Sequence, residues 1–242
     1  MPTYRTDAII IGRTDYGEAD RILRIITPTE GKQAAIAKGT RRLKSRSGGH
    51  LELFGEVSLM LVPGRNMEVV ASASVTWYPH DLAGDFDRLG LAFMAATMID
   101  RLMEENHPQP EIYYCLSEAL HALNDGAGGV YFELWFKLRL VRLLGYQPEL
   151  RVCATCGGRA VDGHYWFSAE KGGIVDETCR NSIDQAISQP AIKLWRLLLE
   201  EPYATIRTIT KGLELAEESI EICNEFYRYH LGRTFTPSIS TL

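Results

Sequence analysis

Two short cysteine-bearing tetrapeptides carry residue types that bind metal ions. CATC spans residues 153–156 and DETC spans residues 176–179, so their ligand-type residues follow the spacing C-x2-C-x19-D-x2-C. Two paired half-sites across such a gap are typical of structural zinc, which accepts carboxylate oxygen as well as thiolate sulfur. The spacing therefore predicts a zinc site whose ligands are Cys153, Cys156, Asp176 and Cys179.

The fourth ligand is open to other interpretations. His164 lies eight residues after Cys156, and imidazole is a common zinc ligand, although this position breaks the paired spacing. A third interpretation is a degenerate cluster that holds no metal. A closed four-ligand site leaves no position for substrate, so a metal bound here is expected to be structural.

A second candidate site is the glycine-containing basic stretch KGTRRLKSRSGGH, residues 38–50, which contains no acidic residue. Concentrated positive charge on a loop suits a phosphate backbone, and glycine allows backbone to approach a ligand closely. The alternative without a binding function is a solvated loop that has no partner. The cations that we expect to contact nucleic acid are Lys38, Arg41, Arg42, Lys44, Arg46 and, in the VPGRN turn, Arg65.

The net charge of −5 conceals an asymmetry between the two parts of the chain. Residues 1–80 contain 11 Lys or Arg and 8 Asp or Glu, whereas residues 81–242 contain 15 and 23. Such asymmetry suggests two regions with different partners.

Five short apolar runs separated by turn formers precede residue 80. They predict strands, and five strands in about 75 residues fit a small closed barrel. The pattern alone does not distinguish an OB-fold from an SH3-like barrel. The runs are DAIIIGRT, DRILRIITP, KQAAIAKG, GEVSLMLVPG and MEVVASASV.

After residue 80 the apolar spacing changes to three and four residues, which predicts amphipathic helices. One run, VYFELWFKLRLVRLLG, is apolar on most faces, as expected of a central buried helix. We therefore expect an α+β multidomain protein: a barrel over residues 1–80 and a helical domain over residues 81–242. Residues 150–181 are expected to form a zinc-finger-like insertion in that helical domain.

Composition and motifs exclude several classes of protein. The longest apolar run carries charges and cannot cross a bilayer, and the first residues lack a secretory signal pattern. Five cysteines, an odd number, argue against a disulfide framework and for the reducing cytoplasm. The common nucleotide-binding and hydrolase motifs do not occur, so we expect no enzyme activity.

Three stretches together resemble the RecO recombination-mediator family of bacteria. They are KGTRRLKSRSGGHLELFGEVSLMLVPGRN, FELWFKLRLVRLLGYQPELRVCATCG and YWFSAEKGGIVDETC. The most specific part is GYQPELRVCATCG after the hydrophobic helix. Aspartate stands in DETC where many members have a cysteine, which puts the metal in doubt at that corner.

The resemblance implies an N-terminal OB-fold and a helical domain with a zinc-finger-like element. It also implies binding and annealing of single- and double-stranded DNA in the RecFOR pathway of recombinational repair. Implied partners are RecR, RecF in many bacteria and single-stranded-DNA-binding protein (SSB), with RecA loading on gapped DNA as the outcome. A nucleoid-associated location follows. The alternatives are a general OB-fold RNA- or DNA-binding module or chaperone outside repair, and a scaffold.

Overall fold

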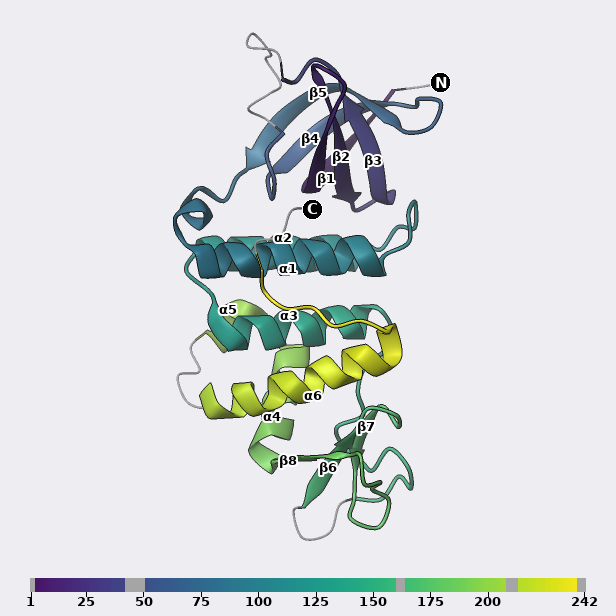
Figure 1. Ribbon diagram of the computed structural model, residues 1–242, viewed down its shortest axis with the longest axis vertical. Helices are drawn as coiled ribbons and strands as arrows, with labels where there is room; N and C mark the ends of the chain where they lie inside the picture. Colours follow the sequence, from purple (N-terminus) through teal and green to yellow (C-terminus); the bar gives the residue numbers. More distant parts are fainter. Residues whose placement is uncertain (1–2, 42–50, 160–163, 208–212, 239–242) are drawn as a thin grey trace. The chain divides into compact units, whose positions relative to one another are not determined.

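The computed structural model describes residues 3–41, 51–159, 164–207 and 213–238 of the 242-residue chain. By internal packing the chain divides into two compact units. Unit 1 comprises residues 1–126 and 237–242, and unit 2 comprises residues 127–236. Each unit is described separately, and Figure 1 labels their elements.

Unit 1 contains a closed five-stranded barrel with the order β1-β2-β3-β5-β4. Neighbouring strands are antiparallel except β3 and β5, which pair in parallel at Ala35–Glu68 and Ile36–Val69. This barrel confirms the expected OB-fold. The strands are β1 (Tyr4–Tyr16), β2 (Asp20–Thr27), β3 (Gly31–Ala37), β4 (Glu56–Val62) and β5 (Glu68–Trp77).

The barrel interior follows from the alternation of side chains along each strand. In β3 every second residue from Gly31 to Ala37 is buried, and in β4 Val57, Leu59 and Leu61 are buried. The apolar residues among them form one core with Ala8, Ile10 and their neighbours on β2. Because the side-chain period of a strand is two, the EVSLML pattern allows only the face with Val57, Leu59 and Leu61 to point inward.

Two helices of unit 1 pack against the outside of this barrel. They are α1 (Phe86–Leu102) and α2 (Pro110–Asn124), preceded by the 3-10 turn η2 (His80–Gly84). Ile9 and Ile26 pair with each other and are fully buried without belonging to the interior core. Since α1 contacts β1 and α2 contacts β2, these helices cover the barrel's second apolar face.

Polar contacts fasten the helices to the barrel. Asp100 on α1 accepts a 2.8 Å hydrogen bond from Arg24 of β2. On β4, Glu56 accepts one of 2.6 Å from Ser117 and lies 3.1 Å from Nε2 of His121, both on α2. The expected boundary near residue 80 stays a prediction, but these contacts place α1 and α2 in the same compact unit as the barrel.

Unit 2 is built on the buried helix α3 (Gly129–Leu143), which packs against α4 (Gln189–Glu200) and α6 (Leu213–Leu231). Trp135 of α3 and Trp195 of α4 are fully buried. The short helix α5 (Tyr203–Ile206) follows α4. The remaining elements form a three-stranded sheet with the order β7-β6-β8: β6 (Tyr165–Ser168), β7 (Gly173–Val175) and β8 (Gln185–Ile187).

The sheet is therefore wider than the insertion expected over residues 150–181, because β8 adds to the free edge of β6. Glycine is required at the β6–β7 turn, where Gly172 has a φ of +74°. At Gly173 a Cβ would meet the backbone of Glu149 at 2.3 Å. This close approach joins the chain before the CATC turn to the sheet.

Candidate metal centre and nucleic-acid interface

The CATC segment folds into a tight turn that directs two sulfurs toward one point. The amide of Gly157 donates to the carbonyl of Cys153, and the amide of Cys153 donates to that of Gly158, both at 2.8 Å. The amide of Gly158 lies 3.4 Å from Sγ of Cys156. Gly157 has a φ of +74°, which explains why glycine follows the second cysteine.

The DETC segment forms a second turn organised by one oxygen of Asp176. Oδ1 accepts hydrogen bonds from the amide of Thr178 at 3.0 Å, from its hydroxyl at 2.7 Å and from the amide of Cys179 at 2.9 Å. The other oxygen, Oδ2, lies 3.3 Å from Sγ of Cys156. One carboxylate oxygen thus holds the turn and the other faces the cysteines.

The two turns bring together the metal-ligand cluster: Cys153, Cys156, Asp176 and Cys179. Their ligand atoms all lie within 4.8 Å of one another. A tetrahedral zinc ion with sulfur at about 2.3 Å separates its ligands by somewhat less than 4 Å, so the cluster fits zinc after a small contraction. The donor set of three sulfurs and one oxygen also suits zinc.

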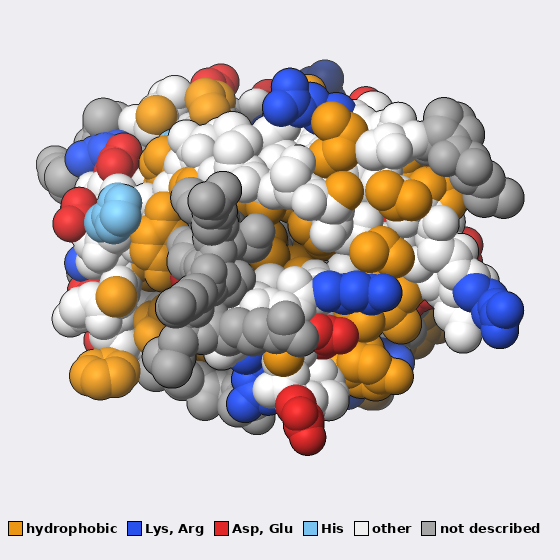
Figure 2. Space-filling view, turned by 90° about the horizontal axis from the view of Figure 1, so that it is seen from above, with side chains coloured by type: hydrophobic (Ala, Val, Ile, Leu, Met, Phe, Trp, Pro, Cys, Tyr) orange, Lys and Arg blue, Asp and Glu red, His pale blue; other side chains and the backbone are white. Residues whose placement is uncertain are grey.

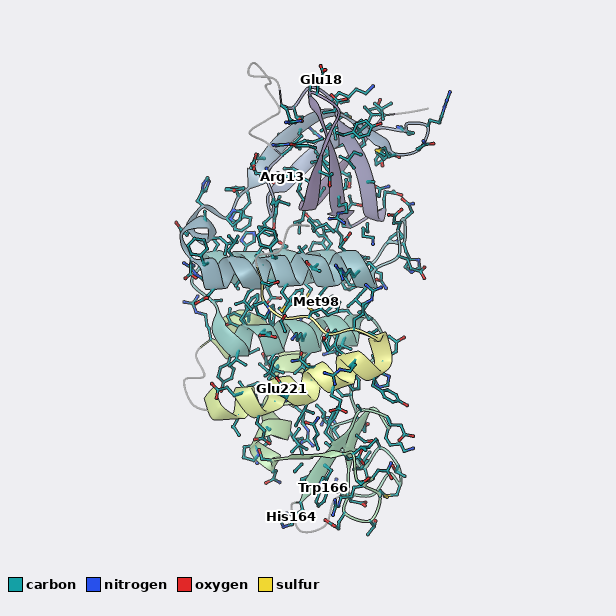
Figure 3. The ribbon with its side chains drawn as sticks, viewed as in Figure 1. Arg13, Glu18, Met98, His164, Trp166 and Glu221 are labelled. Atoms are coloured by element: carbon teal, nitrogen blue, oxygen red, sulfur yellow. The ribbon has the colours of Figure 1, made fainter. Side chains whose placement is uncertain are left out.

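His164 does not belong to the metal-ligand cluster. It precedes β6, its side chain is exposed, and Figure 3 labels it near Trp166. Among the described residues only the predicted cysteines and Asp176 have the proximity that a metal requires. The geometry therefore favours Asp176 over His164 as the fourth ligand.

Hydrogen bonds among the groups of the cluster shift their pKa values. The hydroxyl of Thr178 and the thiol of Cys156 are the main donors that lower the pKa of Asp176. For Cys179, Thr178 lowers the pKa, but desolvation, Asp176 and the other two thiols outweigh it and raise the pKa to about 12. A carboxylate surrounded by thiols is the arrangement from which a metal ion would displace protons.

The basic stretch begins directly after β3. Lys38 is exposed, and Gly39 turns the chain with a φ of +67° while its amide donates to Asp20 at 2.7 Å. Arg41 is also exposed, and its Nε lies 3.3 Å from Oδ2 of Asp15. Arg42, Lys44 and Arg46 lie outside the described residues.

Arg65 occupies a different part of the barrel. The parallel register aligns Glu68 with Ala35, so the turn before β5 is level with the beginning of β3, whereas Lys38 follows its end. In Figure 2 the Lys and Arg side chains on the barrel end are separated by uncharged ones. The described cations thus do not form one continuous patch with Arg65.

Sequence reasoning missed two polar residues of the barrel. Gln33 is only 8% exposed at an inward position of β3, and Glu68 begins β5 on the same face as the core-packed Val70. The available signal was Gln33 itself, a polar residue at a core position of KQAAIA.

An OB barrel is a fold that binds oligonucleotides and oligosaccharides. Together with a metal-ligand cluster on a helical unit, it defines a class of two-part proteins suited to nucleic acid. The chain belongs to the RecO family of recombination proteins. The description "Recombination protein O N terminal" matches residues 1–78, and "Recombination protein O C terminal" matches residues 83–238.

Individual relatives agree with this membership. The chain is similar to "DNA repair protein RecO" of Roseiflexus sp. (strain RS-1), 40% identical over 201 residues, covering 82% of this chain and 71% of the relative. The protein of the same name from Bifidobacterium adolescentis is 32% identical over 242 residues, covering 96% of both. One from Dehalococcoides mccartyi (strain 195) is 32% identical over 220 residues, covering 88% of this chain and 87% of the relative.

The resemblance read from the sequence is therefore confirmed, and family membership supports a role in DNA repair. The relatives' names state a repair role and no catalytic activity. Within the described residues, no helix combines the length and apolar character needed to span a bilayer.

Proposed function

We propose that this chain is a DNA-binding recombination mediator that anneals complementary single strands and helps load RecA on SSB-coated gapped DNA. The observation that carries the proposal is an OB barrel, in a RecO-family chain, whose β3 leads directly into exposed Lys38 and Arg41. Annealing makes and breaks no covalent bond, so the protein needs to hold two strands together and has no need of a catalytic group.

Phosphate contacts of the basic stretch supply the affinity. Each cation that neutralises a phosphate releases condensed counterions, so binding weakens as salt rises. If three to five of its cations contact single-stranded DNA, the slope of log affinity against log salt is roughly −2 to −3.5. Because phosphates are common to all sequences, this part of the interface has little sequence preference.

The proposed partners are single- and double-stranded DNA, RecR, SSB and, in bacteria that use it, RecF. The metal-ligand cluster would hold structural zinc, whose chemistry is to cross-link the CATC and DETC turns. The proposed location is the cytoplasm, at the nucleoid.

The decisive experiment measures annealing of complementary strands already coated with SSB, together with single-stranded-DNA affinity at two salt concentrations. A variant with Arg41, Arg42 and Lys44 changed to Glu should lose annealing and most of its DNA affinity. The matched control changes three exposed cations on helices away from the basic stretch to Glu and alters the net charge equally. They are Arg101, Lys193 and Arg228.

The outcomes separate the proposed function from its alternatives. Loss of DNA binding in both variants would indicate that only net charge matters. Unchanged DNA affinity in the basic-stretch variant would favour a scaffold whose barrel binds protein. Binding of DNA without annealing of SSB-coated strands would favour a general OB-fold RNA- or DNA-binding module or chaperone.

A further inference from the structure

A polar pocket of about 250 Å³ opens at one end of the barrel, beside the β3–β5 seam. Its lining comes from β3, the β4–β5 turn and the segment after α1, all within unit 1. We call it the mouth pocket, and the residues that matter for its chemistry are Gln33, Arg65, Asn66, Glu68, Glu105 and Asn106.

Two groups at the mouth pocket have unused hydrogen-bonding capacity. Within the described part of the chain, Oε1 of Gln33 and Oε2 of Glu68 are buried without a hydrogen-bond partner. Leaving such acceptors unpaired costs free energy, so buried polar groups of this kind normally have a partner in the functional state. What is missing is a hydrogen-bond donor.

Tyr4 does not supply enough hydrogen-bond donors for both oxygens. Its pKa is raised chiefly by burial, with the Gln33 amide opposing and the Glu68 carboxylate adding to the shift, so its hydroxyl lies near both groups. One hydroxyl has one proton to donate, and it can satisfy at most one of the two oxygens. The terminal torsions of Gln and Glu are soft, so the other oxygen can turn toward a ligand.

The remaining lining shows what kind of ligand fits. Nε2 of Gln33 donates to Oδ1 of Asn106 at 3.4 Å, which leaves Oε1 of Gln33 as an acceptor and the amino group of Asn106 as a donor. The amide of Asn66 carries both a donor and an acceptor, as the edge of a nucleobase does. Arg65 is exposed at the turn, where it would attract a phosphate, while the carboxylates of Glu68 and Glu105 in the same lining would accept from N–H donors. These features favour a nucleotide over a basic side chain of a protein.

We propose that the mouth pocket takes one unstacked base of single-stranded DNA, with guanine preferred, while Arg65 contacts its phosphate. Guanine presents adjacent N1–H and N2–H donors, which one carboxylate accepts together, so Glu68 would bind this edge. The O6 and N7 acceptors would face the amides. This inference rests on the proposed function and adds base selectivity to it.

The backbone supports this role for the turn. A Cβ at Gly64 would meet the carbonyl oxygen of Met67 at 2.3 Å, so the VPGRN turn is tight and positions Arg65 and Asn66 closely. On the other side of the pocket, the amide of Asn106 donates to the carbonyl of Lys32 at 2.9 Å. Asn106 itself has a φ of +56°, an uncommon conformation held by this contact.

The test compares fluorescence anisotropy of a thymidine 12-mer with the same oligomer carrying one central guanine or one central inosine, which lacks the N2 amine. Guanine should tighten binding about fivefold or more, the lower end of what a bidentate base contact gives. Inosine should lose most of the gain. In Glu68→Gln the affinity for the guanine-containing oligomer should be about equal to that for the thymidine 12-mer. Glu104→Gln, a matched change outside the lining, should keep the preference for guanine.

The outcomes distinguish failure of the inference from failure of the proposed function. If the thymidine 12-mer binds and guanine brings no gain, or if Glu68→Gln keeps the gain, the mouth pocket does not bind a base. If no oligomer binds, the proposed function fails, and NMR titration with dGMP and dTMP decides the pocket alone. Saturable shifts of the Gln33 and Asn106 amide signals with dGMP only would support it, and their absence would overturn it.

Discussion

The two oxygens of the Asp176 carboxylate have different tasks. Oδ1 accepts three hydrogen bonds that hold the DETC turn, whereas Oδ2 points to the cysteines. An asparagine can keep a carbonyl oxygen in the first position but then presents a neutral amide nitrogen in the second. At this corner, therefore, we expect aspartate to serve as a metal ligand in place of cysteine and asparagine to fail.

Asp176→Asn should accordingly retain the fold and lose zinc. We expect zinc affinity to fall at least about tenfold, since even the loss of a group that only hydrogen-bonds to a ligand costs that much. Competition with a chromophoric chelator measures it. His164→Asn is the control and should retain zinc. Loss of zinc in His164→Asn and its retention in Asp176→Asn would instead identify His164 as the ligand.

Arg41 is paired with a carboxylate that would compete with the phosphates of bound DNA. Asp15 lies 3.3 Å from Nε of Arg41 and accepts from Arg21 at 3.1 Å. In Asp15→Asn, Arg41 loses this carboxylate, whereas Arg21 still has Glu52 at 3.8 Å. We expect affinity for single-stranded DNA to rise up to about fivefold, the equivalent of an exposed ion pair. Asp125→Asn, another exposed aspartate, should change affinity little; an equal rise there would implicate net charge alone.

At the scale of elements, α3 and α6 are joined by a buried polar network. Nζ of Lys137, which is fully buried, lies 2.5 Å from Glu133 and 2.7 Å from Oδ1 of Asn224. The hydroxyl of Tyr227 donates to the carbonyl of Lys137 at 2.7 Å. Such a network favours this pairing of the two helices, because a shift of one helix along the other would break these contacts.

Lys137→Met should destabilise the protein by about 3–5 kcal/mol, because it leaves Glu133 charged and unpaired. Urea unfolding followed by circular dichroism measures the change. In Lys137→Met with Glu133→Gln, much of the loss should be recovered. If the double variant were as unstable as the single one, packing rather than charge would explain the effect.

Much of this element structure could be predicted from the sequence, because strand alternation and helical spacing are local signals. The three strands of the small sheet could not, since segments of three or four residues are decided by tertiary pairing. The metal-ligand cluster followed from spacing. The mouth pocket did not, because Gln33 and Glu68 are brought together by a crossover between β3 and β5.

At the scale of the whole molecule, the candidate metal centre and the barrel that we propose to bind DNA lie in different compact units. Removing zinc with a chelator should therefore lower the thermal stability of the protein while affinity for a thymidine 12-mer stays within about twofold. A thermal melt and an anisotropy titration of the same chelated sample measure both. Loss of DNA affinity on chelation would show that the metal centre also shapes the interface.

The contacts of Glu56 with α2 also indicate which fragment of this protein should fold independently. A fragment ending near residue 80 would uncover Ile9 and Ile26 and deprive Glu56 of Ser117 and His121. Strands that expose apolar side chains in this way tend to aggregate. A fragment of residues 1–126 keeps α1 and α2 over these strands, so fusion proteins that use this barrel should include both helices.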